Sequence, residues 1–376
     1  MSTNEMTRAW MEIRPDALRR NLARIRDSVG PGVGLVPMVK ADAYGTGVGG
    51  AVSALAAESP WGFGVAAVEE GVQLRSLGVD GPVVVFSPTP PGSVPAALEA
   101  GLTLTVSSPG TLDLMERAGA AARGAAFHLE VDTGMGRAGF DWRRVAEWGP
   151  RARSAHDAGI RWAGCYTHLH SADEDRATVD VQWSRFQGAL AAAPLPQEGV
   201  LVHALNSAGC FRAPEYAGDL VRPGIFLYGG SIGKDLPSPE EVVAVRARVV
   251  HVRSAPEGTT AGYGATYRSG GDERWATVAV GYGDGLPRSL GNRGHALVRG
   301  TRVPIIGRIS MDVTVVDITH IPEVSPGDVV TFVGSDGSER ITVDEVAQQV
   351  GTISYEILTG FTPRVSRIWM DEGHGS

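Results

Sequence analysis

The stretch GLVPMVKADAYG, residues 34–45, is an apolar run that ends in a lysine, and it opens the pattern that decides the fold. The run Leu35–Lys40 is followed by seven similar ones, at Gly62–Val65, Val83–Ser87, Leu102–Val106, Phe127–Asp132, Ile160–His168, Leu201–Leu205 and Leu220–Tyr228. These runs are mostly β-branched or aromatic and too short for helices, which favours buried strands. Eight strands that alternate with helical stretches predict an α/β protein with a (β/α)8 barrel of the TIM type. A doubly wound open sheet is the alternative.

Helical spacing of apolar residues, with Arg, Glu and Asp between them, predicts helices between the strands. Such segments lie at Glu69–Leu77, Pro109–Ala118, Trp142–Ala158 and Asp175–Ala193. Ahead of the first run we expect a strand at Ala9–Ile13 and a helix at Asp16–Val29.

Past the Pro/Gly/Ser-rich stretch from Gly229 to Pro239, the pattern changes to alternation without intervening helices. It predicts strands at Val242–Val252, Trp275–Val280, Ala296–Val298, Thr301–Ile309, Val313–Ile318 and Val329–Val333, and then a helix at Val343–Val350. We therefore expect a barrel domain over residues 1–236 and a C-terminal all-β domain over residues 237–376. The strand at Ala9–Ile13 is free to pack with the second of these.

The composition argues against several classes of function. The net charge is −8 and the pI about 5.6, and no basic run is interleaved with aromatic residues, so we expect no nucleic-acid partner. No segment is apolar enough for a signal peptide or a bilayer span, so we expect a cytoplasmic protein without a membrane partner. The two cysteines, Cys165 and Cys210, are far apart and predict ordinary buried thiols.

Lysine is almost absent from the chain, and this directs attention to Lys40. Of 34 basic residues, only Lys40 and Lys234 are lysines. A lysine supplies a neutral nucleophilic amine, which arginine does not because guanidinium stays protonated in proteins. Lys234 lies in a polar turn, whereas Lys40 ends an apolar run. Lys40 is therefore a candidate nucleophile; a lysine that reaches solvent from a strand end is the alternative.

Several polar side chains fall where the predicted barrel strands end, which is the face that carries the active site in TIM barrels. They are Lys40, Arg137, His168, Asn206, Ser207, Arg222 and Tyr228. His168 and His170 form a His-x-His pair that could bind a metal, but a metal-dependent hydrolase needs further ligands at neighbouring strands. We expect no metal site and a structural role for His170.

Two motifs in the β domain, Gly262-Tyr-Gly264 and Gly281-Tyr-Gly-Asp-Gly285, flank a tyrosine with glycines. Glycine permits a sharp turn or a close approach of backbone to another surface. The motifs are equally compatible with tight hairpins.

Together these segments resemble the alanine racemase family over essentially the whole chain. The motifs that match, in the family's order and approximate spacing, are Val39-Lys-Ala-Asp-Ala-Tyr-Gly45, Asp132-Thr-Gly-Met-Gly-Arg137, Arg222-Pro-Gly-Ile225 with Tyr228-Gly229, Tyr263-Gly-Ala-Thr-Tyr267, Gly281-Tyr-Gly-Asp-Gly285 and Met311-Asp312. Six motifs in order make the resemblance specific. It implies a homodimeric amino-acid racemase that depends on pyridoxal 5′-phosphate (PLP) and makes D-alanine for peptidoglycan or a natural product.

The resemblance also assigns the reacting groups. Lys40 would hold PLP as an imine and act as the base on the D face, and the partner's Tyr263 would act on the L face. Racemisation needs two such groups, because the α-proton leaves one face and returns on the other. Arg222 would face the pyridine nitrogen and, as a group that only donates, keep it unprotonated. His168 would link Arg222 to Tyr263 by hydrogen bonds.

Further positions match the family's binding residues. The resemblance implies cofactor contacts for Tyr44, Arg137, His168, Asn206, Ser207, Gly224, Ile225 and Tyr355. It implies substrate contacts for Arg137 and, from the partner chain, for Met311, Asp312 and Tyr282.

The chain departs from the family pattern at Glu130, where many members have a lysine that becomes carbamylated and orients the equivalent of Arg137. Because glutamate already carries a carboxylate, we expect Glu130 to hold Arg137 directly, without CO₂. Ser310, Asp42 and Thr46 replace a frequent cysteine, asparagine and histidine, which leaves the range of substrates open.

Three alternatives stay open at this stage. The first is a racemase of broad specificity or one that prefers serine, since a pocket discriminates a hydroxyl or methylene only weakly. The second is a PLP-dependent decarboxylase of the same architecture, against which Arg222 and Tyr263 argue. The third is a PLP-binding barrel without enzymatic activity, which usually lacks the β domain.

Overall fold

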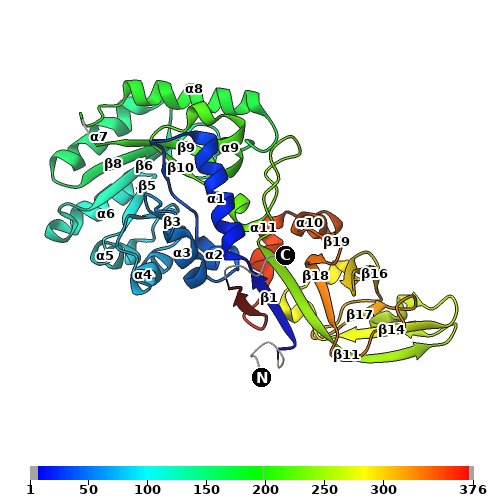
Figure 1. Cartoon of the computed structure of the whole chain (residues 1–376). Coiled ribbons are helices and arrows are strands. Elements are labelled where there is room, and N and C mark those ends of the chain that lie inside the picture. Colours follow the sequence, from blue (N-terminus) through cyan, green and yellow to red (C-terminus); the bar gives the residue numbers. More distant parts are fainter. Residues whose placement is uncertain (1–6, 198, 372–376) are drawn as a thin grey trace.

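The computed structural model describes residues 7–197 and 199–371. Figure 1 shows a barrel surrounded by helices on one side and a group of strands on the other. The barrel strands are parallel, in the order β2, β10, β9, β8, β6, β5, β4, β3. A bridge between Met38 and Gly64 joins the two ends of this order, so the sheet closes. The predicted barrel is confirmed and the open sheet is excluded.

The barrel strands have the following bounds: β2 Gly34–Leu35, β3 Phe63–Val65, β4 Val83–Val85, β5 Thr103–Val106, β6 Ala126–Asp132, β8 Arg161–Tyr166, β9 Leu201–Asn206 and β10 Leu220–Arg222. A short strand, β7 (Phe140–Asp141), adds to β6. The helices around them are α1 Pro15–Val29, α3 Val48–Ala56, α4 Val68–Ser76, α5 Val94–Glu99, α6 Pro109–Arg117, α7 Val145–Asp157, α8 Arg176–Ala192 and α9 Ser207–Arg212. Their apolar stripes, such as Leu18, Leu22 and Ile25 of α1, are fully buried against the barrel.

The second sheet consists of β1 Ala9–Ile13, β11 Val243–Ala255, β14 Glu273–Val278, β15 His295–Val298, β16 Thr301–Ile306, β17 Thr314–Asp317, β18 Val329–Asp336, β19 Glu339–Ile341 and β20 Ser366–Trp369. The long strand β11 pairs with β1, β14 and β18. Its pairing with β18 joins two strands that are distant in the sheet order, so the sheet closes on itself. The helices α10 (Val343–Val350) and α11 (Ser354–Gly360) follow β19, and the short strands β12 (Thr260–Ala261) and β13 (Tyr267–Arg268) form a separate pair. The predicted β-rich second part is confirmed, and β1 belongs to its sheet.

Two predicted strands differ from the structure most in extent. The run Leu35–Lys40 is a regular strand only at its start: beyond Pro37, which lacks an N–H for the ladder, pairing continues only as the bridge at Met38, and Lys40 begins the short helical segment α2 (Lys40–Tyr44). The run Leu220–Tyr228 leaves the sheet after Arg222, where Pro223 and Gly224 follow, and continues as the 3₁₀ turn η4 (Ile225–Tyr228). The side chains of this turn are buried. Burial alone therefore gave the same apolar signal as a strand.

Candidate active site

A cavity of about 340 Å³ lies at the carboxyl ends of the barrel strands. Every cofactor-binding residue that the sequence predicts lines it, and so does Glu130. Helix α11 contributes Tyr355 from beyond the barrel. The residues that we expected to meet at the strand ends thus lie around one cavity. Tyr263, Tyr282, Met311 and Asp312 lie outside the cavity of their own chain.

Lys40 stands immediately before a left-handed turn. Ala41, Asp42, Ala43 and Tyr44 all have φ between 52° and 55°. This conformation costs non-glycine residues roughly 1–2 kcal/mol each, so surrounding contacts must hold it. Asp42 Oδ1 accepts the Val48 N–H at 2.8 Å, and Tyr44 stacks on Tyr228 with ring centroids 4.6 Å apart.

The environment of Lys40 favours the neutral amine. Burial lowers the pKa of Lys40, and the charges of Arg137 and Arg222 lower it further, while Glu70 opposes them. A larger neutral fraction at neutral pH is what imine formation requires of a lysine.

Arg222 is a buried cation in the wall of the cavity, and no carboxylate of the described residues forms an ion pair with it. Its guanidinium donates to His203 Nδ1 at 2.6 Å and to the Thr167 and Ala204 carbonyls. It also lies over the Tyr166 ring, 5.0 Å from the centroid. Burial lowers the pKa of Arg222 to about 10, so the group stays charged at neutral pH and presents a positive charge to any ligand in the cavity.

Two buried histidines behind Arg222 were not found from the sequence. His203 Nε2 lies 2.9 Å from His128 Nδ1, which makes a chain of three side chains from Arg222 to His128. Both histidines lie on barrel strands. The sequence feature that could have revealed them is a histidine in the middle of an apolar strand run.

His168 lines the cavity beside Arg222. Its Nδ1 is 3.5 Å from the Arg222 guanidinium. Burial, and then the charge of Arg222, lower the pKa of His168 to about 3, so its imidazole is neutral. The predicted link from Arg222 to His168 is present at the limit of a hydrogen bond.

The expected bond between Glu130 and Arg137 is wrong. Among the described residues no hydrogen bond or ion pair joins them, and Glu130 Oε2 is buried without a partner. Burial raises the pKa of Glu130, although the charges of Arg137 and Arg222 oppose this. Glu130 is buried in the cavity wall, and one of its carboxylate oxygens has no hydrogen-bond partner there.

Small and hydroxylated residues form another part of the cavity wall. Ser207 Oγ accepts the Gly224 N–H at 2.7 Å. A Cβ at Gly224 would lie 2.2 Å from the Tyr44 hydroxyl, so only glycine fits there. A nucleophilic amine, a buried cation and a hydroxyl-lined recess within one cavity fit the aldehyde, ring and phosphate of PLP.

The tyrosines of the two glycine motifs lie exposed on the β domain. Tyr263 is 70% exposed, Met311 52% and Tyr282 41%. Gly262 has φ 71°, and a Cβ there would lie 2.8 Å from the Arg308 backbone nitrogen, so the glycine permits a close approach of two loops. The loop that carries Tyr282 also lies close to a neighbouring loop, because the Tyr282 N–H donates to the Ser310 carbonyl at 3.0 Å.

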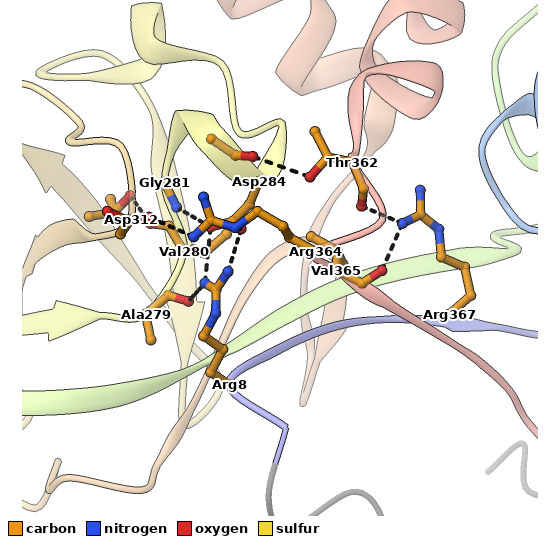
Figure 2. A network of polar contacts seen from close by, with 12 residues as sticks. Arg8, Ala279, Val280, Gly281, Asp284, Asp312, Thr362, Arg364, Val365 and Arg367 are labelled. Atoms are coloured by element: carbon orange, nitrogen blue, oxygen red, sulfur yellow. Dashed lines mark hydrogen bonds and ion pairs between the residues drawn. The ribbon is translucent and has the colours of Figure 1, made fainter.

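A buried carboxylate orders this second loop (Figure 2). Asp284 accepts two hydrogen bonds from Arg8, at 2.5 and 3.0 Å, and the Gly281 N–H at 3.0 Å. Arg364 pairs with Asp284 at 3.1 Å and with Asp312 at 2.5 Å. Residues near the two ends of the chain therefore fix the loops that carry Tyr282 and Asp312.

Residues 7–197 and 199–371 contain neither a metal-binding cluster nor a membrane-spanning helix. No group of three or more His, Cys, Asp or Glu side chains is placed to hold a metal ion, and His170 instead contacts Ser171. Within the same residues, no helix has the length and apolar character that a bilayer crossing requires.

Comparison with known proteins gives matches along nearly the whole chain. The family described as alanine racemase, N-terminal domain, matches residues 13–232, and alanine racemase, C-terminal domain, matches residues 242–369. The alanine racemase of Desulfosudis oleivorans is 36% identical, over 96% of each chain.

Solved structures agree with this. The alanine racemase of Streptomyces coelicolor A3(2) superposes with a TM-score of 0.92 at 32% identity, over 99% of this chain and 100% of the other. That of Bartonella henselae, whose structure contains covalently bound pyridoxal phosphate, gives a TM-score of 0.88 at 28% identity, over 97% and 100% of the chains.

Proposed function

Because the chain belongs to the alanine racemase family, and is thus an isomerase, we propose that it interconverts L- and D-alanine with PLP held by Lys40. The observation that carries the proposal is the cavity, in which a lysine with a lowered pKa, the buried Arg222 and the recess at Gly224 meet. The two domains would divide near residues 236 and 237, and D-alanine would serve peptidoglycan or a natural product.

When bound, PLP withdraws electrons from Cα and makes the α-proton labile. Lys40 holds the cofactor and moves the proton on the D face. Arg222 only donates, so it would keep the pyridine nitrogen of a bound cofactor from gaining a proton. Tyr44, Ser207, Gly224, Ile225 and Tyr355 bind the phosphate, with Asn206 beside them, and Arg137 binds the substrate carboxylate.

The second face needs a group that the cavity of one chain does not provide. Tyr263 is exposed outside it, and Tyr282 and Met311 are exposed on the same domain. A homodimer in which the partner's Tyr263 reaches the L face would bury this tyrosine and complete the site. In the same assembly the partner's Met311, Asp312 and Tyr282 would complete the carboxylate pocket and its opening.

The first experiment incubates the purified protein with PLP and each L-amino acid in turn and resolves the enantiomers. We expect D-alanine as the main product, and a larger yield of D-serine would favour the serine-preferring alternative. Release of carbon dioxide without D-product would favour a decarboxylase and contradict the proposal.

A second experiment tests cofactor attachment. Reduction of the PLP-loaded protein with borohydride should fix the cofactor on the peptide that contains Lys40, as read by mass spectrometry. The Lys40→Arg variant keeps the positive charge but lacks a neutral amine, and should show no attachment. Attachment at Lys234 would be contrary to the proposal.

A third experiment tests the shared site. The variants Lys40→Ala and Tyr263→Phe are each expected to be inactive. After verified subunit exchange, a mixed dimer has one intact composite site, and part of the activity should return. No recovery would argue against a site built from two chains.

A further inference from the structure

Glu70 makes more contacts than its place in a helix requires. It is the third residue of α4 and accepts the Ala67 N–H at 3.1 Å, which is the usual role of a glutamate in the first turn. The same oxygen also accepts the Ala66 N–H at 2.8 Å. Its other oxygen accepts the Ala41 N–H at 2.7 Å, 29 residues earlier in the chain. This last and shortest bond contributes nothing to the helix cap.

The bond to Ala41 reaches the residue directly after Lys40. Ala41 is the first of four consecutive residues with left-handed backbone, a conformation that these residue types rarely adopt. Lys40 and Ala66 both line the cavity, and Glu70 bridges the backbone beside them. The carboxylate therefore connects the strained turn to the loop between β3 and α4.

We propose that Glu70 is a positioning residue, whose carboxylate holds the left-handed turn and thereby keeps the Lys40 amine directed into the cavity. The proposal rests on the proposed function only in taking Lys40 as the group that binds PLP. Both carboxylate oxygens are needed, since each accepts from a different segment.

The variant Glu70→Gln separates this role from simple packing. Glutamine has nearly the same shape, but one oxygen becomes an NH₂ group, which only donates. Its one oxygen should stay with Ala66 and Ala67, which offer two N–H donors against the single one of Ala41, so Ala41 faces the NH₂ group and loses its acceptor. The matched control is Glu69→Gln, the same chemical change at the exposed neighbouring position of α4.

Hydrogen exchange of the protein without cofactor is the first measurement. In E70Q the amides of residues 41–44 should exchange about tenfold faster than in wild type, as expected when a hydrogen bond to a charged group is lost. E69Q should match wild type. The second measurement is the rate of PLP attachment to Lys40, trapped by borohydride, which should fall in E70Q and stay unchanged in E69Q. With the substrate identified, kcat should fall more than KM changes, because the amine and not the substrate pocket is displaced.

Equal exchange and equal attachment rates in E70Q and E69Q would overturn the proposal. If wild type does not attach PLP at Lys40, the proposed function fails, while the exchange of residues 41–44 still decides whether Glu70 holds the turn. Should E70Q not fold, Glu70→Asp carries the same measurements. It keeps two acceptor oxygens on a side chain that is one carbon shorter, so it can cap α4 but should no longer reach Ala41, and unchanged exchange at Ala41 would count against the proposal.

Discussion

Arg222 donates a hydrogen bond of 2.6 Å to Nδ1 of His203, and this bond determines the protonation of the residues behind it. Because guanidinium only donates, His203 Nδ1 is the acceptor and its proton sits on Nε2. That proton is donated to His128 Nδ1 at 2.9 Å, which places the His128 proton on Nε2, an atom without a partner. Burial, and then the charge of Arg222, lower the pKa of His128 to about 3, and both histidines are neutral. The positive charge therefore stays on Arg222, beside the cavity.

This bond leads to a prediction for His203. In His203→Ala a buried N–H of Arg222 loses its acceptor, which should lower the free energy of unfolding by about 1–3 kcal/mol. In His203→Asn the side-chain oxygen can take the place of Nδ1, and part of this loss should be recovered. Urea unfolding of both variants is the measurement. Equal stability of the two would show that the acceptor contributes nothing.

The Asp284 cluster predicts a stability that depends on pH. Burial alone would raise the pKa of Asp284, but the hydrogen bonds from Arg8 and Gly281 and the charges of Arg8 and Arg364 outweigh it and lower the pKa. A lowered folded-state pKa gives stability that is fully present above the unfolded value near 3.9 and is lost as the pH falls through the folded value. Asp284→Asn should therefore unfold more easily at pH 7 by roughly 1–3 kcal/mol, since Arg8 and Arg364 are partly exposed.

Below about pH 4 the difference between wild type and Asp284→Asn should shrink, as wild type also loses the charge. The control is Asp157→Asn, which removes an exposed pair with Arg153 and should cost at most about 1 kcal/mol. Equal effects of the two substitutions at pH 7 would contradict a special role for Asp284.

The sequence was most informative about the barrel side of the site. The scarcity of lysine singled out Lys40, and the rule that reacting groups sit at strand ends brought Arg137, His168 and Arg222 to one rim. Both predictions need only what can be read along the chain, namely the chemistry of each residue and the position at which an apolar run stops. The structure places all four side chains around the same cavity.

The sign of the backbone angle φ and the pairing of individual side chains could not be predicted from the sequence. Asp adopts left-handed φ only as a single residue, so Ala41-Asp-Ala-Tyr44 does not predict four such residues in a row, and contacts such as the one from Glu70 must help to hold the turn. The expected bond between Glu130 and Arg137 failed for a related reason, because charge complementarity does not specify where two side chains point. Helix α11, which carries Tyr355, has only seven residues and too little periodicity to be recognised.

Glu130 predicts the opposite pH dependence to Asp284. Burial raises its pKa, so the folded protein binds this proton more tightly than the unfolded chain does. The stability that this gives is present below the unfolded pKa and is lost as the pH rises through the folded one. Glu130→Gln, which stays neutral, should therefore be more stable than wild type at pH 7, and the difference should vanish as the pH falls below about 4.

The same position makes a prediction about bicarbonate. Because Glu130 cannot be carbamylated, wild-type activity should not change when bicarbonate is removed or added. Glu130→Lys is the matched comparison, since only an amine can take up CO₂ at this site. A bicarbonate requirement in wild type would contradict the expectation.

The recess at Gly224 gives the last prediction. In Gly224→Ala the new Cβ would lie 2.2 Å from the Tyr44 hydroxyl and 3.1 Å from its ring carbon, so Tyr44 must move out of the position in which it would meet the phosphate. We expect PLP affinity to fall at least about tenfold, equivalent to 1.4 kcal/mol, in a spectroscopic titration. Gly188→Ala is the control: Gly188 lies within α8 with no atom near its would-be Cβ, so the variant should bind PLP normally and gain roughly 0.5–1 kcal/mol of stability. If Gly224→Ala binds PLP as tightly as Gly188→Ala does, the cofactor phosphate does not use this recess, because the added methyl group and the displaced Tyr44 would leave no room for it there.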